Sequence, residues 1–135
     1  MPANTDIDKA KKRLGNLITK CRERDMSLRQ LAVKVGLSPS NMKYIEDGIN
    51  CPTANIYSSL ISVLKPSPKQ HKEMDQAYMI IRNTPPPDVC ELIIKNQELI
   101  PFLRTMARGQ PTKEQIDKLL ASFANETIKG ETNDG

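Results

Sequence analysis

Few residues of this chain have the chemistry of a catalytic or metal site. His71 is its single histidine, and the cysteines Cys21, Cys51 and Cys90 lie far apart, without a Cys-x-x-Cys pair. One histidine in a polar segment supports no Ser/His/Asp or Cys/His set, and the sequence has no glycine-rich phosphate loop. We therefore expect no enzyme, no cofactor and no bound metal. We interpret Cys21 and Cys51 as small buried hydrophobic residues, with a redox switch as the alternative.

The charge of the chain is unevenly distributed. Residues 1–65 hold 11 Lys and Arg against 6 Asp and Glu, whereas residues 66–135 hold 9 against 10. The basic half favours a polyanionic partner. No apolar run approaches the roughly 18 residues that cross a bilayer, and the N-terminal segment has no apolar signal core. We expect a soluble, cytoplasmic protein without membrane contact, in a reducing compartment.

The apolar periodicity predicts helices along the whole chain. Aromatic residues make up only 4% of it and strand-like runs are missing, so we expect an all-α fold. Two short helices meet at Gly36, a residue that suits a left-handed helix end. Ser27 and Gln30 have the spacing of a capping box at the start of the first helix. Ser38 suits the N-cap of the second helix, with Pro39 at its first position.

Further helices are expected on both sides of this pair. One should run from Asp8 to about Arg24, and another should begin at Pro52 and Thr53. The buried stripe expected for the latter is Ile56, Leu60, Ile61 and Leu64. Two short helices around a Gly-containing turn, the second with a polar outer face, have the layout of a helix-turn-helix unit. The major groove of a DNA duplex is wide enough for one such helix.

The segment 14–64 resembles the Cro/lambda-repressor-like family of helix-turn-helix proteins, often called the XRE family. The resemblance rests on Leu14-Gly15, Ile18, Arg22, Ser27, Leu31-Ala32, Gly36, Leu37-Ser38, Ile45-Glu46, Gly48 and Pro52. It implies a five-helix DNA-binding domain, here residues 8–65. It also implies that the third helix, about Pro39–Asp47, enters the major groove.

The resemblance implies roles for individual side chains. The base-reading positions are Pro39, Ser40, Lys43 and Tyr44. Lys43 could donate to guanine, and Ser40 could donate or accept. The expected phosphate contacts are Arg29, Asn41, Ile49 and Asn50, the last two through their backbone N–H groups.

Two positions near the expected DNA contacts, Leu28 and Glu46, carry residues that do not suit a contact with DNA. Leu28 stands where family members often carry a glutamine that touches the DNA backbone, so that task moves to Arg29. Glu46 would be repelled by phosphate, and we expect it to pair with Arg22 and hold the fold. The alternatives are structural: an ordinary helical hairpin, a solvated Lys43 and a packing role for Tyr44. The basic run at 9–13 could face phosphate or solvent.

The prolines of "KPSPKQ", residues 65–70, interrupt the helical pattern and predict the end of the first domain. Residues 66–126 should then form a small helical unit for oligomerisation or regulation. Residues 1–7 are expected to be a flexible arm, and the polar residues 127–135 a disordered tail.

The apolar stripes of the second unit exceed what its short helices can bury alone, so we expect a homodimer. The interface residues expected are Leu92, Ile93, Leu99, Phe102, Leu103, Met106, Ile116, Leu119, Leu120 and Phe123. The sequence thus predicts a sequence-specific regulator of transcription that binds double-stranded DNA, a dimeric repressor reading a palindromic operator. The alternative is an antitoxin or adaptor whose C-terminal helices bind a heterologous protein, with DNA binding serving autoregulation.

Overall fold

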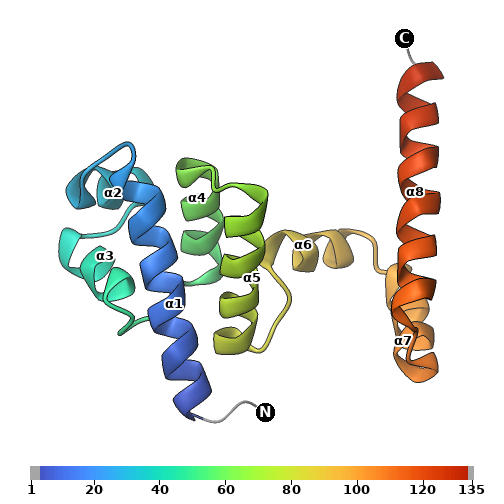
Figure 1. Cartoon of the computed structure of the whole chain (residues 1–135), viewed down its shortest axis with the longest axis horizontal. Coiled ribbons are helices and arrows are strands. Elements are labelled where there is room, and N and C mark those ends of the chain that lie inside the picture. The colour runs from blue at the N-terminus through green and yellow to red at the C-terminus, as the bar shows by residue number, and fades with distance from the viewer. Residues whose placement is uncertain (1–3, 134–135) are drawn as a thin grey trace. The chain divides into compact units, whose positions relative to one another are not determined.

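A computed structural model describes residues 4–133 of the chain, with side chains as far as Asn125. All regular structure in these residues is helical, which confirms the all-α fold class. The helices are α1 (Asn4–Glu23), α2 (Leu28–Val35), α3 (Pro39–Glu46), α4 (Ala54–Leu64), α5 (Pro68–Arg82), α6 (Pro87–Lys95), α7 (Leu99–Gly109) and α8 (Lys113–Asn133) (Figure 1). None of the helices in this described part is long and apolar enough to cross a bilayer.

The chain forms two compact units, of which the first ends at Ile94 and the second begins at Lys95. In the first unit α1 packs against α3, α4 and α5, and α2 packs against α3 and α4. Figure 1 shows α1 between the short helices α2 and α3 on one side and α4 and α5 on the other. The long first helix is therefore the element on which the rest of the unit assembles.

The division between units lies beyond the boundary that the prolines of residues 65–70 indicated. Residues 8–65 contain α1 to α4, and α5 follows the expected boundary but packs along α1. The prolines begin a helix here: Ser67 is the N-cap of α5, Pro68 is its first residue, and Ser67 and Gln70 form a capping box. Proline is favourable at this position because its missing N–H would have no partner in the helix.

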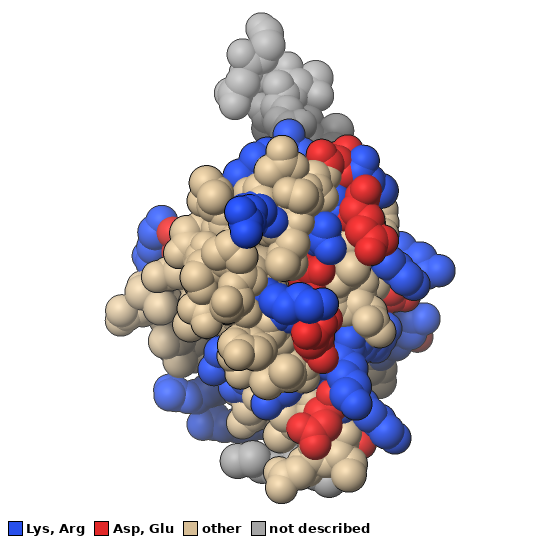
Figure 2. Space-filling view, turned by 90° about the vertical axis from the view of Figure 1, so that its left-hand side faces the viewer, with Lys and Arg blue, Asp and Glu red and all other residues tan. Residues whose placement is uncertain are grey.

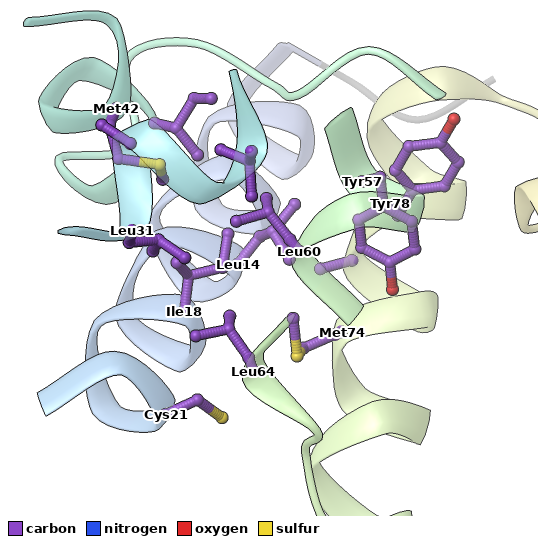
Figure 3. Packing of buried hydrophobic residues seen from close by; sticks show 14 of the residues in the cluster. Leu14, Ile18, Cys21, Leu31, Met42, Tyr57, Leu60, Leu64, Met74 and Tyr78 are labelled. Atoms are coloured by element: carbon purple, nitrogen blue, oxygen red, sulfur yellow. The ribbon is translucent and has the colours of Figure 1, made fainter. Parts of the chain in front are cut away.

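The core of the first unit is built by all five helices α1 to α5. Leu14, Ile18 and Leu31 are fully buried, together with Met42 and Leu60 (Figure 3). The remaining buried apolar residues are Ala10, Cys21, Ala32, Val35, Ile45, Tyr57, Leu64, Met74, Ala77 and Tyr78. Tyr57 of α4 and Tyr78 of α5 stack with ring centroids 4.3 Å apart, which joins α5 to the core.

The ends of the described chain are more helical than the sequence indicated. α1 begins at Asn4, so residues 4–7 of the expected arm are helix; residues 1–3 lie outside the described part. α8 continues to Asn133, through most of the segment 127–135 expected to be disordered, and residues 134–135 lie outside the described part. Glu and Lys have good intrinsic helix propensity, which the polar composition of the tail did not reveal.

The second unit differs from the first in the burial of its side chains. α7 and α8 are joined by three residues, and Thr112 and Gln115 form the capping box that the sequence predicted. No residue of α7 is buried, and every side chain of α8 described, from Lys113 to Asn125, is exposed. This unit therefore has helices but no interior of its own among its described side chains.

Candidate nucleic-acid interface

The ends of α2 and α3 are formed by the side chains that the sequence analysis identified. Ser27 accepts from the Gln30 amide at 3.2 Å and donates its own amide to the Gln30 side chain at 2.8 Å. Gly36 ends α2 in the left-handed region at φ 79°. Ser38 then accepts from the Asn41 amide at 3.2 Å, with Pro39 in the first turn. Local capping chemistry thus sets the turn between the two helices.

The inner face of α3 is fixed by close packing against α1. Met42 and Ile45 are buried in the core, and Gly15 of α1 lies directly below the end of α3. A Cβ atom at Gly15 would lie 2.7 Å from the carbonyl oxygen of Ile45 and would also overlap the carbonyl of Glu46. Only glycine allows the two helices to approach this closely, which explains the Leu14-Gly15 pair in the sequence.

The Arg22–Glu46 pair forms as expected and links the two helices electrostatically. Arg22 donates from Nε to Glu46 Oε2 at 2.7 Å and from Nη2 to Oε1 at 3.0 Å, the two-point geometry that suits a carboxylate. Thr19 donates a further bond to Glu46 Oε1 at 2.9 Å. The hydrogen bond to Glu46 raises the pKa of Arg22. Glu46 is 8% exposed, so this carboxylate locks the fold rather than facing a ligand.

The outer face of α3 carries the expected base-reading residues, and all of them are exposed: Pro39, Ser40, Lys43 and Tyr44. Tyr44 is 46% exposed, so its ring is not a core residue. Lys43 forms an exposed ion pair with Asp47, Nζ to Oδ1 at 3.1 Å, one helical turn away. The spacing of Lys43 and Asp47 could have revealed this pair. Asp47 competes with any other acceptor for the Lys43 ammonium. Because both side chains are exposed, their ion pair contributes little to stability.

The expected phosphate contacts of α2 and α3 have exposed side chains, as the expected base-reading residues do. Arg29 and Asn41 are exposed, while Leu28 is half-buried and packs against the core cluster. Leu28 therefore packs against the core, at the position where family members often have a glutamine that contacts the DNA backbone. Arg29, its neighbour, is the side chain that projects from the start of α2.

The loop that follows α3 requires a correction. The backbone N–H groups of Ile49 and Asn50 were expected to contact phosphate, but both already donate to the carbonyl of Tyr44, at 2.9 and 3.2 Å. This bonding depends on Gly48, whose φ of 75° turns the chain back over the end of α3. The exposed side chain of Asn50 remains free to face outward as a polar group.

Basic side chains accompany this loop. Gly48 rests on the backbone of α1, where an added Cβ atom would lie 2.7 Å from the Cα of Lys12. Burial raises the pKa of the Cys51 thiol in the same loop, and the positive charges of Arg82 and then of Lys11 act in the opposite direction. Figure 2 shows the side of the molecule on which α2 and α3 lie: Lys and Arg are spread over it, and Asp and Glu gather mainly along one side. The basic run of α1 therefore adjoins the loop after α3.

Comparisons with protein-family models, with curated proteins and with solved structures found no match to this chain. Among the described residues, no group of three or more His, Cys, Asp or Glu side chains could hold a metal ion.

Proposed function

We propose that this protein is a sequence-specific transcriptional regulator that binds double-stranded DNA and reads the major groove with α3. One observation carries the proposal. The polar face of α3, with Ser40, Lys43 and Tyr44, is exposed, while the opposite face is fixed to α1 through Ile45 and Glu46. A rigidly held helix with an open polar face is what reading base edges requires.

The exposed side chains divide into two groups by chemistry. On α3, Lys43 donates to guanine O6 or N7 after leaving Asp47, and Ser40 donates or accepts at a base edge. Tyr44 reaches a base edge or phosphate with its hydroxyl, and Pro39 contacts the groove as an apolar surface. Arg29, Asn41 and the side chain of Asn50 contact phosphates, which position the protein but carry no sequence information.

The test is selection of bound duplexes from a random pool at two salt concentrations, with a single-stranded pool as the control. The proposal expects enrichment of a palindromic consensus from the duplex pool, and affinity that falls steeply with salt because phosphate contacts release counterions. If no duplex sequence is enriched even at low salt, the proposal is wrong.

We further propose that the regulator is a homodimer held by α7 and α8. The support is the lack of an interior: Phe102 is 48% exposed, Leu119 45% and Leu120 62%, and a cavity of about 330 Å³ lies between the two helices. Units of about 40 residues usually need oligomerisation, disulfides or metals to fold. Residues 95–135 hold six basic and six acidic residues, so two copies would not repel each other. Two such hairpins would complete a four-helix bundle.

The expected interface is not confined to this hairpin. Leu92 and Ile93 lie on α6 in the first unit, with Leu92 exposed and Ile93 half-buried. The other eight residues lie on α7 and α8, where Leu99 and Met106 are half-buried and the rest are exposed. The dimer proposal therefore rests on α7 and α8 alone.

Sedimentation of the wild type and of Leu119→Asp tests the dimer. The wild type should be dimeric at low micromolar concentration and Leu119→Asp monomeric, while Val33→Asp, a change at a 77%-exposed apolar residue of α2, should stay dimeric. A wild-type monomer at high micromolar concentration would contradict the dimer. The same apolar surface supports the alternative function, an antitoxin or adaptor, and a wild-type monomer that forms a stoichiometric complex with the product of a neighbouring gene would favour it.

A further inference from the structure

The loop between α3 and α4, residues 47–53, is held at its first half by α3 and α1. The amides of Ile49 and Asn50 donate to the carbonyl of Tyr44, and Gly48 lies against the backbone of Lys12. These contacts fix where the loop leaves the reading helix. They leave the second half, Cys51 and Pro52, to be held by other elements.

The second half of the loop is held by Arg82, the last residue of α5. Its Nη2 donates to the carbonyl of Cys51 at 2.9 Å and to that of Pro52 at 3.0 Å, and its Nε also donates to Pro52 at 3.3 Å. Pro52 is fully buried and Cys51 is half-buried. Arg82 itself is exposed, its bonds to Pro52 are part-buried and its bond to Cys51 is exposed, so one guanidinium at the surface ties down both carbonyls.

Arginine is suited to this task by its shape. The planar guanidinium presents several N–H donors in a fixed fork, whereas a lysine ammonium is a point charge on a flexible stem. Through Nη2 and Nε, Arg82 fixes the distance between the end of α5 and the carbonyls of Cys51 and Pro52. A lysine would keep the positive charge but would not reproduce these three bonds, so charge and geometry can be separated by experiment.

We propose that Arg82 is a positioning residue for DNA binding: it fixes the loop so that the Asn50 side chain meets a phosphate. This inference rests on the proposed DNA-binding function. It extends the binding apparatus to α5, a helix outside the segment 14–64 that resembles the helix-turn-helix family. The guanidinium itself does not contact DNA in this proposal, because its bonds are made to the loop.

The experiment uses the full-length chain and the duplex enriched from the random pool. Arg82→Lys and Arg82→Gln should both weaken binding about tenfold, the scale of a lost charge-assisted hydrogen bond. The slope of log affinity against log salt should be unchanged in both, because no phosphate-neutralising charge is lost. In an Asn50→Ala background, Arg82→Lys should cause no further loss. Arg24→Lys is the matched control, because Arg24 bonds the carbonyl of Cys21 away from the loop, and it should bind as the wild type does.

Three results would overturn the proposal. If Arg82→Lys binds normally while Arg82→Gln lowers the salt slope by about 0.9, Arg82 contacts phosphate directly. If both variants melt earlier but bind normally while folded, the role is structural only. If the losses of binding free energy in Arg82→Lys and Asn50→Ala add in the double variant, Arg82 does not act through Asn50.

A wild type that binds no duplex is a failure of the proposed function and is recognised as such. The restraint on the loop has its own measurement without DNA. Release of the Cys51 and Pro52 carbonyls should loosen the chain next to Asn50, so the Asn50 amide should exchange with solvent faster in Arg82→Lys than in the wild type, while the Ile49 amide, one residue further from the Arg82 bonds, should change less. Unchanged exchange in that variant would show that Arg82 does not hold the loop.

Discussion

The two units of this chain have similar helices but opposite interiors. In the first unit five helices enclose a core in which Leu14, Ile18 and Leu60 are at most 1% exposed. In the second, Phe102 on α7 is 48% exposed and Leu120 on α8 is 62% exposed, although α8 begins with the capping box of Thr112 and Gln115. Capping and periodicity form a helix locally, but burial requires a partner element. The first unit carries its partners within one chain, and we propose that the second obtains them from another copy.

Breaking the link between α1 and α3 should have the largest effect on the first unit. Arg22→Ala leaves Glu46 buried without its cation, which should lower the free energy of unfolding by about 3–5 kcal/mol, measured by urea denaturation. Lys43→Ala removes the cation of an exposed pair and should cost less than about 1 kcal/mol. Equal losses in the two variants would contradict the contrast between a buried lock and an exposed pair.

Truncating one leucine in each unit tests the contrast between the interiors. Leu60→Ala should destabilise the first unit by about 2–5 kcal/mol, because it leaves a cavity in a closed core. Leu120→Ala should leave the unfolding midpoint of the first unit unchanged and should weaken association, seen by sedimentation at graded concentrations. A Leu120→Ala protein that associates as tightly as the wild type would argue against the proposed interface.

Glycine substitutions give a smaller effect of the same kind. Gly15→Ala should cost about 1–3 kcal/mol, because the new methyl group overlaps the carbonyls of Ile45 and Glu46. Gly109→Ala, at the end of α7, meets no atom within 4 Å and should change stability by about 1 kcal/mol or less. The melting temperatures of the two variants compare Gly15, where two helices are in close contact, with Gly109, where an added Cβ atom would meet no other atom within 4 Å. A neutral Gly15→Ala would contradict the close approach of Gly15 to the carbonyls of Ile45 and Glu46.

The smallest effect concerns the pH dependence of the first unit. Burial, and then the hydrogen bond to Asp75 at 2.6 Å, raises the pKa of Tyr57 above its ordinary value of about 10. The unfolded chain loses this proton first, so stability is fully present below about pH 10 and falls as the pH rises beyond it. Tyr57→Phe should show a shallower alkaline loss in urea denaturation at graded pH. Burial also raises the pKa of Tyr78, which should preserve part of the loss in the variant. Identical alkaline profiles would remove Tyr57 as a cause.

Local chemistry made α2, α3 and the turn between them predictable. Ser27, Gln30, Gly36 and Ser38 act within four residues of their partners, so spacing alone indicated their roles, and each cap forms. The same signature at Ser67 and Gln70 was missed because the neighbouring prolines were interpreted as a break. The buried stripe expected for α4 is confirmed at Leu60 and Leu64, but it missed Tyr57, which is buried, and Ile56 and Ile61 are only half-buried.

Contacts between distant residues could not be predicted in this way. Arg82 lies 30 residues from Pro52, and no spacing rule connects them. The Ile49 and Asn50 amides looked available because their bonds to Tyr44 depend on how Gly48 folds the chain back. The Arg22–Glu46 pair was anticipated because the resemblance to a known fold supplied the missing tertiary information. The side chains on α3 were placed by the same route, and whether they read bases is still a prediction.

The most direct test of the central claim, that α3 reads base edges, is to repeat the selection from a random duplex pool with Lys43→Ala and with Arg29→Ala. Lys43→Ala should relax the consensus at one position of each half-site and leave the other positions sharp. Arg29→Ala should leave the consensus intact and weaken binding to all sequences alike, because a phosphate contact is blind to sequence. If both variants give the wild-type consensus with the same loss of affinity, Lys43 of α3 does not read bases.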